Sequence, residues 1–193
     1  MANLQRQTQI TAAALKLFDE RGFHGTGMGH LSKAVGMSAS SLYNHFSSKQ
    51  EVLAEVLRTT MERLLREHAS ELVGITDPVE RLRVSMAFHV RFHAENAMDT
   101  RVVNQEILNL QEPTLSIVRQ LRRDYVARWM LILQEGERSG KFQVKDIKIT
   151  CYSLIDMGIG TSLWFNPDST YSASQLGEIY ADAALRQCGI MST

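Results

Sequence analysis

Apolar residues recur every three or four positions along most of this chain, the spacing that places side chains on one face of an α-helix. The alternation of apolar and polar residues that is typical of strands does not occur. The spacing predicts helices over 5–21, 28–35, 38–46, 49–73, 79–93, 101–110, 112–139, 146–165 and 174–188. We therefore expect an all-α fold of about nine helices, with three of them in a small N-terminal unit and the others in a larger body.

Residues that begin and end helices support these limits. Gly22 follows the first helical stretch and suits the left-handed turn after a helix. Ser48, with Glu51 three residues later, is the capping-box arrangement that begins the fourth helix. Gly140 ends the seventh helix, and Ser174 is the expected N-cap of the last one. The fourth helix is long enough to begin in the N-terminal unit and end in the body, so we expect it to link the two mechanically.

The second and third predicted helices, joined by the Gly-containing turn at 35–37, have the order of a helix-turn-helix motif. Ser38 can cap the third helix, and Leu42 and Phe46, four residues apart, can bury one of its faces. The opposite face is polar and small near its start, which suits contact with base edges and phosphates. That DNA-reading face carries Ala39, Ser40, Tyr43 and Asn44.

Charge is distributed unevenly along the 193 residues, although the formal net charge is zero. Residues 1–50 hold an excess of basic over acidic side chains, namely Arg6, Lys16, Arg21, Lys33 and Lys49 against Asp19 and Glu20. Such a small excess of basic side chains attracts DNA only weakly. We therefore expect one DNA-binding head to bind poorly and two heads in a dimer to be needed.

The two cysteines, Cys151 and Cys188, lie within helical apolar patterns and are expected to be core residues, with redox sensing as the alternative. The N-terminus has no secretory signal, and no apolar run is long enough to cross a bilayer. These features predict a cytoplasmic protein that does not enter a membrane.

The first quarter of the chain combines the helix-turn-helix pattern with a matching first helix and a matching start of the fourth. The residues that carry this match are Ala13-Ala14-Leu15, Leu17-Phe18, Arg21-Gly22-Phe23, Gly25-Thr26, Leu31, Gly36, Ser38, Leu42-Tyr43, His45-Phe46 and Ser48-Lys49. Together they resemble the N-terminal domain of the TetR family of dimeric transcriptional regulators. The resemblance implies a helix-turn-helix DNA-binding domain over 1–50 and a helical ligand-binding and dimerisation domain over 51–193.

The resemblance also implies which residues contact double-stranded operator DNA. Ala39 and Ser40 stand where family members contact base edges, and Thr26 and Gly27 stand at a helix start whose N–H groups can hold a phosphate. Phosphate contacts are implied for Ser41, Tyr43, Asn44, His45 and Lys49, next to the cap Ser38. Ala39, Ser40 and Gly29 depart from the residues frequent in the family. Because these side chains offer few hydrogen bonds to base edges, the shape of the DNA groove is expected to contribute much of the discrimination between DNA sequences.

Regulators of this plan need a largely apolar pocket in the body. The residues expected to line it are His89, His93, Arg122, Tyr125, Trp129, Met157 and Trp164. The C-terminal segments Leu163-Trp164-Phe165-Asn166-Pro167-Asp168, Ser172 and Ile179-Tyr180-Ala181 are similar to a branch of the family that regulates fatty-acid and steroid catabolism. That similarity implies an acyl-CoA thioester as one effector class, although Leu163 replaces a basic residue that some of those proteins carry beside the Trp.

The last two helices are expected to form a four-helix bundle with those of a second subunit, because small side chains let another helix approach closely. The interface residues we expect are Leu154, Gly158, Thr161, Ile179 and Ala183.

Other interpretations of the polar residues remain open. His89 and His93 have a metal-chelating spacing, with Glu95 or Glu106 as a further ligand, but a hydrogen-bonded core position is favoured and no metal or other cofactor is expected. An arginine-rich stretch of the seventh helix is expected to be a solvated face, with a site for an acidic effector as the alternative. It holds Arg119, Arg122, Arg123 and Arg128. No nucleophile, phosphate-binding loop or paired-carboxylate motif indicates an enzyme.

These observations together predict a homodimeric repressor that a small apolar or acyl-CoA-type effector releases from a palindromic operator. The alternatives are a ligand-dependent activator and a DNA-binding protein with no small-molecule effector.

Overall fold

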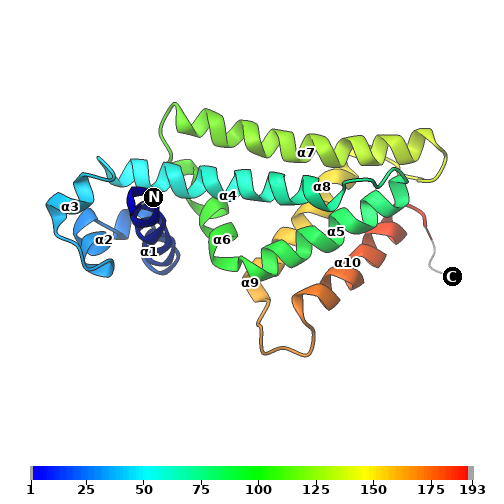
Figure 1. The fold of residues 1–193 in the computed structure, drawn as a ribbon. Coiled ribbons are helices and arrows are strands. Elements are labelled where there is room, and N and C mark those ends of the chain that lie inside the picture. The colour runs from blue at the N-terminus through cyan, green and yellow to red at the C-terminus, as the bar shows by residue number, and fades with distance from the viewer. Residues whose placement is uncertain (1, 191–193) are drawn as a thin grey trace. The chain divides into compact units, whose positions relative to one another are not determined.

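The computed structural model describes residues 2–190, and over this range it contains helices and no strands (Figure 1). This confirms the all-α fold. The helices are α1 (Ala2–Gly25), α2 (Met28–Ala34), α3 (Ala39–Tyr43), α4 (Lys49–Glu71), α5 (Pro78–Glu95), α6 (Ala97–Glu106), a 3₁₀ turn η1 (Ile107–Asn109), α7 (Thr114–Arg138), α8 (Ile147–Ile159), α9 (Thr161–Trp164) and α10 (Ala173–Gln187). Within residues 2–190, none of these helices has the length and apolar character that a bilayer crossing requires.

The chain divides into two compact units. The first consists of the chain up to Glu62 together with Met98–Gln120, and the second consists of Arg63–Ala97 together with the chain from Leu121 onward. Both α4 and α7 therefore contribute residues to each unit. This division follows packing, so the expected functional boundary between residues 50 and 51 remains a prediction.

In the first unit, the N-terminal helices surround a small apolar core. Helix α1 is kinked at Gly22, where φ is 70° and ψ is 167°, as its position after the apolar stripe predicted. The kink returns Phe23 to the interior, with its ring centroid 5.7 Å from that of Phe18. Leu31 of α2 and Leu42 of α3 are fully buried beside them, which completes the predicted three-helix core.

The same unit also contains α6 and η1, which hold the kinked end of α1. The Glu106 carboxylate accepts a hydrogen bond from the Phe23 backbone N–H at 3.0 Å, and Glu106 is buried. Arg101 donates two hydrogen bonds to the Asp19 carboxylate, at 2.8 and 2.7 Å. The spacing of apolar residues indicated none of these contacts, because the partners lie more than 80 positions apart in the chain.

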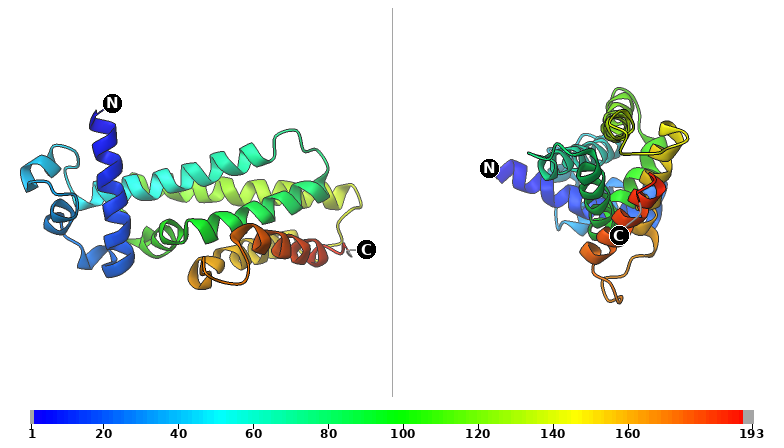
Figure 2. Two further views of the ribbon diagram at one scale, coloured as in Figure 1. Left: turned by 60° about the horizontal axis from the view of Figure 1, so that its bottom comes forward. Right: turned by 90° about the vertical axis from the view of Figure 1, so that its right-hand side faces the viewer.

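In the second unit, α5 is the central helix and packs against α10, α8 and α9, so that α5 and α10 run side by side (Figures 1 and 2). Two glycines permit this close packing. A Cβ atom at Gly158 would lie 2.1 Å from His89 Cδ2, and one at Gly177 would lie 2.7 Å from the Ala87 carbonyl oxygen. The small side chains predicted to admit another helix therefore admit α5 of the same chain.

Several helix limits differ from the predicted ranges, and two of these differences have a local cause in the hydrogen bonds. The stretch 146–165 is divided at Gly160, where the hydroxyls of Thr161 and Ser162 donate to helix carbonyls at 2.7 and 2.8 Å and compete with the main-chain ladder. The N-cap of α10 is Ser172 and not Ser174. Ser172 exchanges hydrogen bonds with Gln175 in a capping box, which Ser174 cannot form because Gly177 lies three residues after it.

Candidate DNA interface and effector region

Helix α3 is positioned by its cap and by its buried face. The Ser38 hydroxyl accepts the Ser41 backbone N–H at 3.1 Å and begins the helix, as predicted. Gly36 in the preceding turn has a φ of 64°, a left-handed conformation that favours glycine. Leu42 and Phe46 are buried, so the other side of the helix must face outward.

The outward face of α3 carries the residues predicted to contact DNA. Ala39, Ser40, Tyr43 and Asn44 are exposed, and Tyr43 keeps 53% of its surface accessible. The hydroxyls of Ser38, Ser40 and Ser41 lie within hydrogen-bond distance of one another, at 3.0 and 2.9 Å. The geometry brings these residues together at one surface, where hydroxyl, phenol and amide groups can reach a phosphate or a base edge.

The start of α2 differs from the expectation at its first residue. Thr26 is only 1% exposed, and its hydroxyl donates to the Leu17 and Gly22 carbonyls at 3.1 and 3.0 Å. The Gly27 N–H donates to His30 Nδ1 at 3.1 Å. The Thr26 side chain therefore holds α2 to α1. The Thr26 backbone N–H donates to the Phe23 carbonyl oxygen at 3.2 Å, so the N–H groups of Thr26 and Gly27, which were expected to hold a phosphate, both have partners inside the unit.

Two of the other predicted phosphate ligands also have partners within the chain. The Lys49 ammonium lies 2.6 Å from the Phe23 carbonyl oxygen and 4.0 Å from the centroid of the Phe23 ring. His45 Nδ1 lies 2.7 Å from Asn3 Oδ1. An ammonium has three N–H donors, so its bond to the carbonyl leaves donors for a phosphate.

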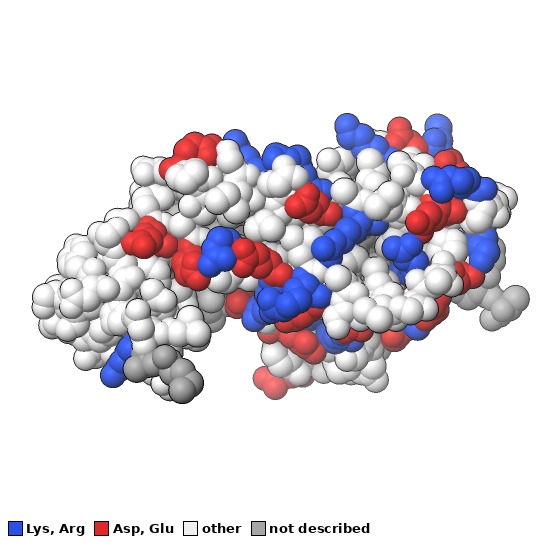
Figure 3. Space-filling view, turned by 45° about the horizontal axis from the view of Figure 1, so that its top comes forward, with Lys and Arg blue, Asp and Glu red and all other residues white. Residues whose placement is uncertain are grey.

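Helices α1–α3 carry few charged residues. On the face that Figure 3 draws, the surface of these helices, at the left of the view, is mainly uncharged. Asp19 is paired with Arg101, and Glu20 lies 4.0 Å from Lys16 in an exposed pair. Arg101 offsets the charge of Asp19, and Lys16 offsets that of Glu20, so the basic excess of residues 1–50 comes from the four remaining side chains, Arg6, Arg21, Lys33 and Lys49.

Four of the residues expected to line an effector pocket lie together inside the second unit. His89, His93, Tyr125 and Trp129 are all at most 4% exposed. His89 Nε2 lies 2.9 Å from the Ile155 carbonyl oxygen, and His89 Nδ1 lies 3.0 Å from the Tyr125 hydroxyl. His93 Nδ1 donates to the His89 carbonyl at 2.9 Å. These contacts connect α5 with α7 and α8 through buried hydrogen bonds.

Burial controls the protonation of this region. It lowers the pKa of His93 to about 4 and that of His89 well below its ordinary value, so both rings are neutral near pH 7. Burial raises the pKa of the Tyr125 hydroxyl, which stays protonated. A neutral cluster of this kind suits an uncharged polar group of a largely apolar ligand.

The three other expected pocket residues are not enclosed. Met157 and Arg122 are half-buried, and burial lowers the pKa of the Arg122 guanidinium. Trp164 is 56% exposed, so it cannot line an enclosed pocket of a single chain. Trp164 lies in α9, a single turn that follows the break at Gly160. The helix expected to continue without interruption over 146–165 had no such break.

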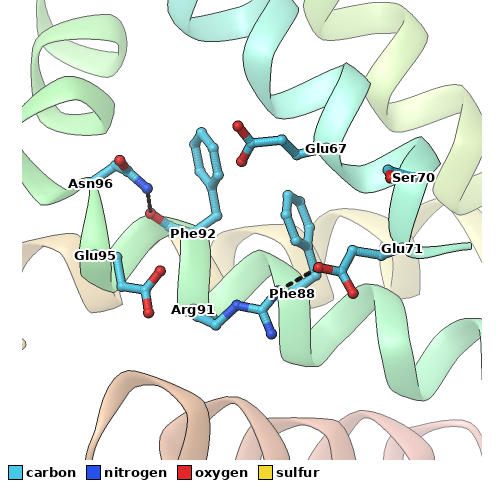
Figure 4. A pocket seen from close by; sticks show the side chains of 8 residues that line it. All are labelled: Glu67, Ser70, Glu71, Phe88, Arg91, Phe92, Glu95 and Asn96. Atoms are coloured by element: carbon cyan, nitrogen blue, oxygen red, sulfur yellow. Dashed lines mark hydrogen bonds and ion pairs between the residues drawn. The ribbon is translucent and has the colours of Figure 1, made fainter.

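A surface pocket of about 290 Å³ lies between the end of α4 and α5 (Figure 4). The rings of Phe88 and Phe92 rise from α5 towards α4. Arg91 is paired with Glu71 at 2.6 Å. The remaining lining residues are Glu67, Ser70, Glu95 and Asn96. Three carboxylates against one guanidinium make this opening unsuitable for a phosphate-bearing group.

The residues of the two alternative sites, the metal site at His89 and His93 and the anion site on the arginine-rich stretch, have other roles in the structure. Both nitrogens of His89 have protein partners, Glu106 binds the Phe23 amide, and no group of three metal-ligating side chains occurs among the described residues. Arg128 donates to the Leu65 carbonyl, which ties α7 to α4. Arg119 and Arg123 are exposed, in keeping with a solvated face.

The residues expected at a dimer interface are divided between two faces. Leu154 and Gly158 of α8 and Thr161 of α9 are buried within the chain, where both helices pack on α5. They cannot contact a second subunit. Ile179 is 44% exposed and Ala183 is half-buried on α10. Exposed apolar side chains nearby in the chain are Ile149, Tyr152, Leu163 and Trp164.

His68 was not among the residues expected to line the pocket, although it lies beside Tyr125 in the same buried region. It followed the apolar stripe of the fourth helix, and a histidine at a buried position was the available signal. His68 is fully buried, its Nε2 lies 3.0 Å from the Ser85 hydroxyl, and its ring lies 5.2 Å from that of Tyr125. Burial, with Arg128 and Arg81 nearby, lowers its pKa to about 4.

Comparison with known proteins matches both parts of the chain. Residues 10–56 match the family described as bacterial regulatory proteins, tetR family, and residues 75–188 match the tetracyclin repressor-like C-terminal domain. The chain is similar to the HTH-type transcriptional repressor KstR2 of Mycolicibacterium smegmatis, with 28% identity over 179 residues that cover 91% of this chain and 86% of that protein.

Two solved structures have a similar fold. The TetR family transcriptional regulator PfmR of Thermus thermophilus has a TM-score of 0.84 and 30% identity, covering 92% of this chain and 97% of that chain. AibR, solved in complex with isovaleryl coenzyme A and operator DNA, has a TM-score of 0.84 and 22% identity, with the same coverage of 92% and 97%.

Proposed function

This chain belongs to the TetR family of bacterial regulatory proteins, which are DNA-binding transcriptional regulators and not enzymes, and we propose that it is a homodimeric, ligand-released repressor. The observation that carries the proposal is the outward face of α3, which presents Ala39, Ser40, Tyr43 and Asn44 while Leu42 and Phe46 are buried. In this proposal residues 1–50 contact the operator, and residues 51–193 bind the effector and the second subunit.

A dimer is required by the weakness of one head. Two reading helices about 34–36 Å apart, one turn of DNA, enter successive major grooves of a palindromic site and add their phosphate contacts. The exposed apolar residues of α8, α9 and α10 support a partner at this surface. Gln187 of α10 donates to Ser153 of α8 at 3.0 Å, so these two helices are neighbours on their exposed side.

A small apolar or acyl-CoA-type effector in the second unit is proposed to oppose DNA binding. The neutral buried cluster around His89 and Tyr125 supports such a site, and the complex of AibR with isovaleryl coenzyme A and operator DNA shows both ligand types on this fold. A ligand that favours a conformation with differently spaced heads weakens DNA binding by a coupling of ~1–3 kcal/mol, and DNA weakens ligand binding equally.

The DNA assignment is tested by gel-shift titration of the protein's own promoter region. Tyr43→Ala should lower affinity for this DNA and for unrelated duplexes alike, because a lost phosphate contact carries no sequence information. Tyr171→Ala is the matched control, since Tyr171 is equally exposed at 51% but follows α9 in the other unit. Unchanged affinity of the Tyr43 variant would contradict the phosphate contact assigned to Tyr43.

The effector assignment is tested by adding medium-chain, long-chain and steroid-derived acyl-CoA thioesters and their free acids to the preformed complex. Release of the DNA by one of these compounds is the expected result. DNA binding that strengthens with a compound would identify an activator or co-repressor arrangement, and binding that no compound alters would contradict effector control.

The dimer assignment is tested by analytical ultracentrifugation. Ile179→Glu should shift the protein from dimer to monomer, because it places a charge in an apolar contact. Leu131→Glu is the matched control, since Leu131 is a 53% exposed apolar residue on α7. A dimer that persists in the Ile179 variant would place the interface elsewhere.

A further inference from the structure

The interior of the second unit contains polar atoms that its own packing leaves without partners. His68 of α4, Ser85 and His89 of α5, and Tyr125 and Trp129 of α7 are all buried, with at most 4% exposure. We call these five residues the interior cluster. The His68 ring stacks on Trp129 with centroids 6.2 Å apart and planes at 16°. His89 meets the same indole edge-on at 5.5 Å.

Most donors and acceptors of the interior cluster are accounted for. The Ile155 carbonyl can only accept, so His89 Nε2 carries the proton and His89 Nδ1 accepts from the Tyr125 hydroxyl. His68 Nε2 is occupied by Ser85. Within the described residues, His68 Nδ1 and Trp129 Nε1 are buried with no hydrogen-bond partner. Trp129 lies close enough to the Tyr125 hydroxyl to lower the pKa of that group, but its indole N–H forms no hydrogen bond with a group of the described chain.

Two unpartnered polar atoms in one buried cluster call for an acceptor from outside the chain. The indole N–H is a donor only, and a buried donor almost always has an acceptor in a folded protein. The missing partner must be an oxygen that is small or carried by an apolar body, because Trp129, Phe88 and Tyr125 surround His68 with rings. When the Ser85 hydroxyl donates to His68 Nε2, the neutral His68 ring carries its proton on Nδ1. A carbonyl oxygen then accepts from both His68 Nδ1 and the indole N–H, and it adds no charge to a cluster flanked by neutral histidines.

The surface pocket of Figure 4 lies next to this cluster. Phe88 lines the pocket and its ring centroid lies 5.8 Å from that of His68, so Phe88 separates the pocket from the cluster. Glu67, Glu71 and Glu95 surround the opening. These carboxylates repel phosphate groups, so an uncharged molecule can occupy this opening more readily than a nucleotide.

We propose that the interior cluster is the part of the effector site that recognises a carbonyl oxygen, with Trp129 Nε1 as donor and His68 Nδ1 as the second polar contact. The inference rests on the proposed function in that the bound molecule is the effector. The oxygen belongs either to a ketone or to a thioester of an otherwise apolar molecule, and the experiment has an arm for each source.

The experiment is isothermal titration calorimetry of the full chain with S-ethyl octanethioate, with ethyl octyl sulfide and with 2-decanone, none of which carries a phosphate group. Ethyl octyl sulfide is the thioether that lacks the carbonyl oxygen and keeps the rest of the ligand. One hydrogen bond to the carbonyl predicts about tenfold tighter binding of the thioester than of the thioether. 2-Decanone tests the ketone source.

Variants identify the residues that read the oxygen. His68→Phe and Trp129→Phe keep an aromatic ring but lose the nitrogen, so each should abolish the preference for thioester over thioether and weaken 2-decanone binding about tenfold. Cys188→Ala is the matched control, because Cys188 is buried in the same unit and lies outside the interior cluster. It should retain the wild-type preference.

Several outcomes overturn the inference. They are equal wild-type affinities for thioester and thioether together with 2-decanone binding that survives both aromatic variants, or no binding of either carbonyl compound. The proposed function is judged separately by gel shift. Release of DNA by a compound whose affinity does not depend on the carbonyl supports the repressor proposal and contradicts this inference. Carbonyl-dependent binding without any release of DNA supports the carbonyl contact and contradicts the repressor proposal.

Discussion

Acidification from pH 8 to pH 5 should destabilise the second unit through its buried histidines. His68 and His93 have pKa values lowered from 6.5 to about 4, and the pKa of His89 is lowered further in the same direction. The cause is burial, to which the guanidiniums of Arg128 and Arg81 add for His68. The unfolded chain therefore binds more protons than the folded one between pH 6.5 and 4, and stability is lost as the pH falls through this window.

The magnitude follows from the lowered pKa values of His68 and His93. At pH 5 a histidine with an ordinary pKa is almost fully protonated when unfolded and almost neutral when folded. Each such residue then costs about 2 kcal/mol relative to pH 8. His68 and His93 together remove about 4 kcal/mol of the free energy of unfolding, and His89 adds to this loss. A domain is commonly stable by only ~5–15 kcal/mol, so the effect is large.

Urea unfolding at fixed protein concentration, followed by far-UV circular dichroism at half-unit steps from pH 8 to pH 5, measures this loss. His93→Gln should reduce the pH-dependent loss by about 2 kcal/mol, because one titrating group is gone. Thr161→Val is the control, since it removes a buried hydroxyl of the same unit and should lower stability equally at both pH values. A loss below about 1 kcal/mol in the wild type, or a full loss retained in His93→Gln, would refute the reasoning.

Three further substitutions test packing seen only in the structure. Gly158→Ala should lower the free energy of unfolding by ~1–3 kcal/mol in a urea titration, because its Cβ would lie 2.1 Å from His89 Cδ2; an unchanged midpoint would contradict that contact. Glu106→Ala should cost ~1–3 kcal/mol, since it leaves the buried Phe23 N–H unpaired, and hydrogen exchange should then accelerate at that amide rather than across the unit. Thr26→Val should lower the melting temperature, through the loss of its two buried hydrogen bonds, and leave the salt dependence of DNA binding unchanged. A flatter salt dependence would instead make Thr26 a phosphate contact.

Buried side chains of the second unit have partners that the sequence did not indicate. His89 and His93 were placed in an effector region because they share an apolar helix face, and the structure buries both. The partner of His89, the Ile155 carbonyl, lies 66 positions away and had no signal in the sequence. The small residues around Gly158 predicted a close helix approach, but the helix that approaches is α5 of the same chain.

Local structure and family membership could both be predicted from the order of residues along the chain. The helical period, the Ser38 cap, the break at Gly22 and the alternation of Leu42 with exposed neighbours are properties of short segments, and each segment carries its own signal. The resemblance over the first quarter of the chain was sufficient to indicate a TetR-family DNA-binding head, which the family match over 10–56 confirms.

The packing of the folded chain was needed to show which element covers each face of the later helices. An apolar stripe shows that a face is buried but not what buries it, so Leu154 could be assigned to a second subunit until α5 was found against it. The hydrogen bond from the Phe23 N–H to the Glu106 carboxylate depends on helices that are far apart in sequence. The same is true of the buried nitrogens of His68 and Trp129 that have no partner. Contacts of this kind arise from the mutual packing of helices, which no single segment encodes.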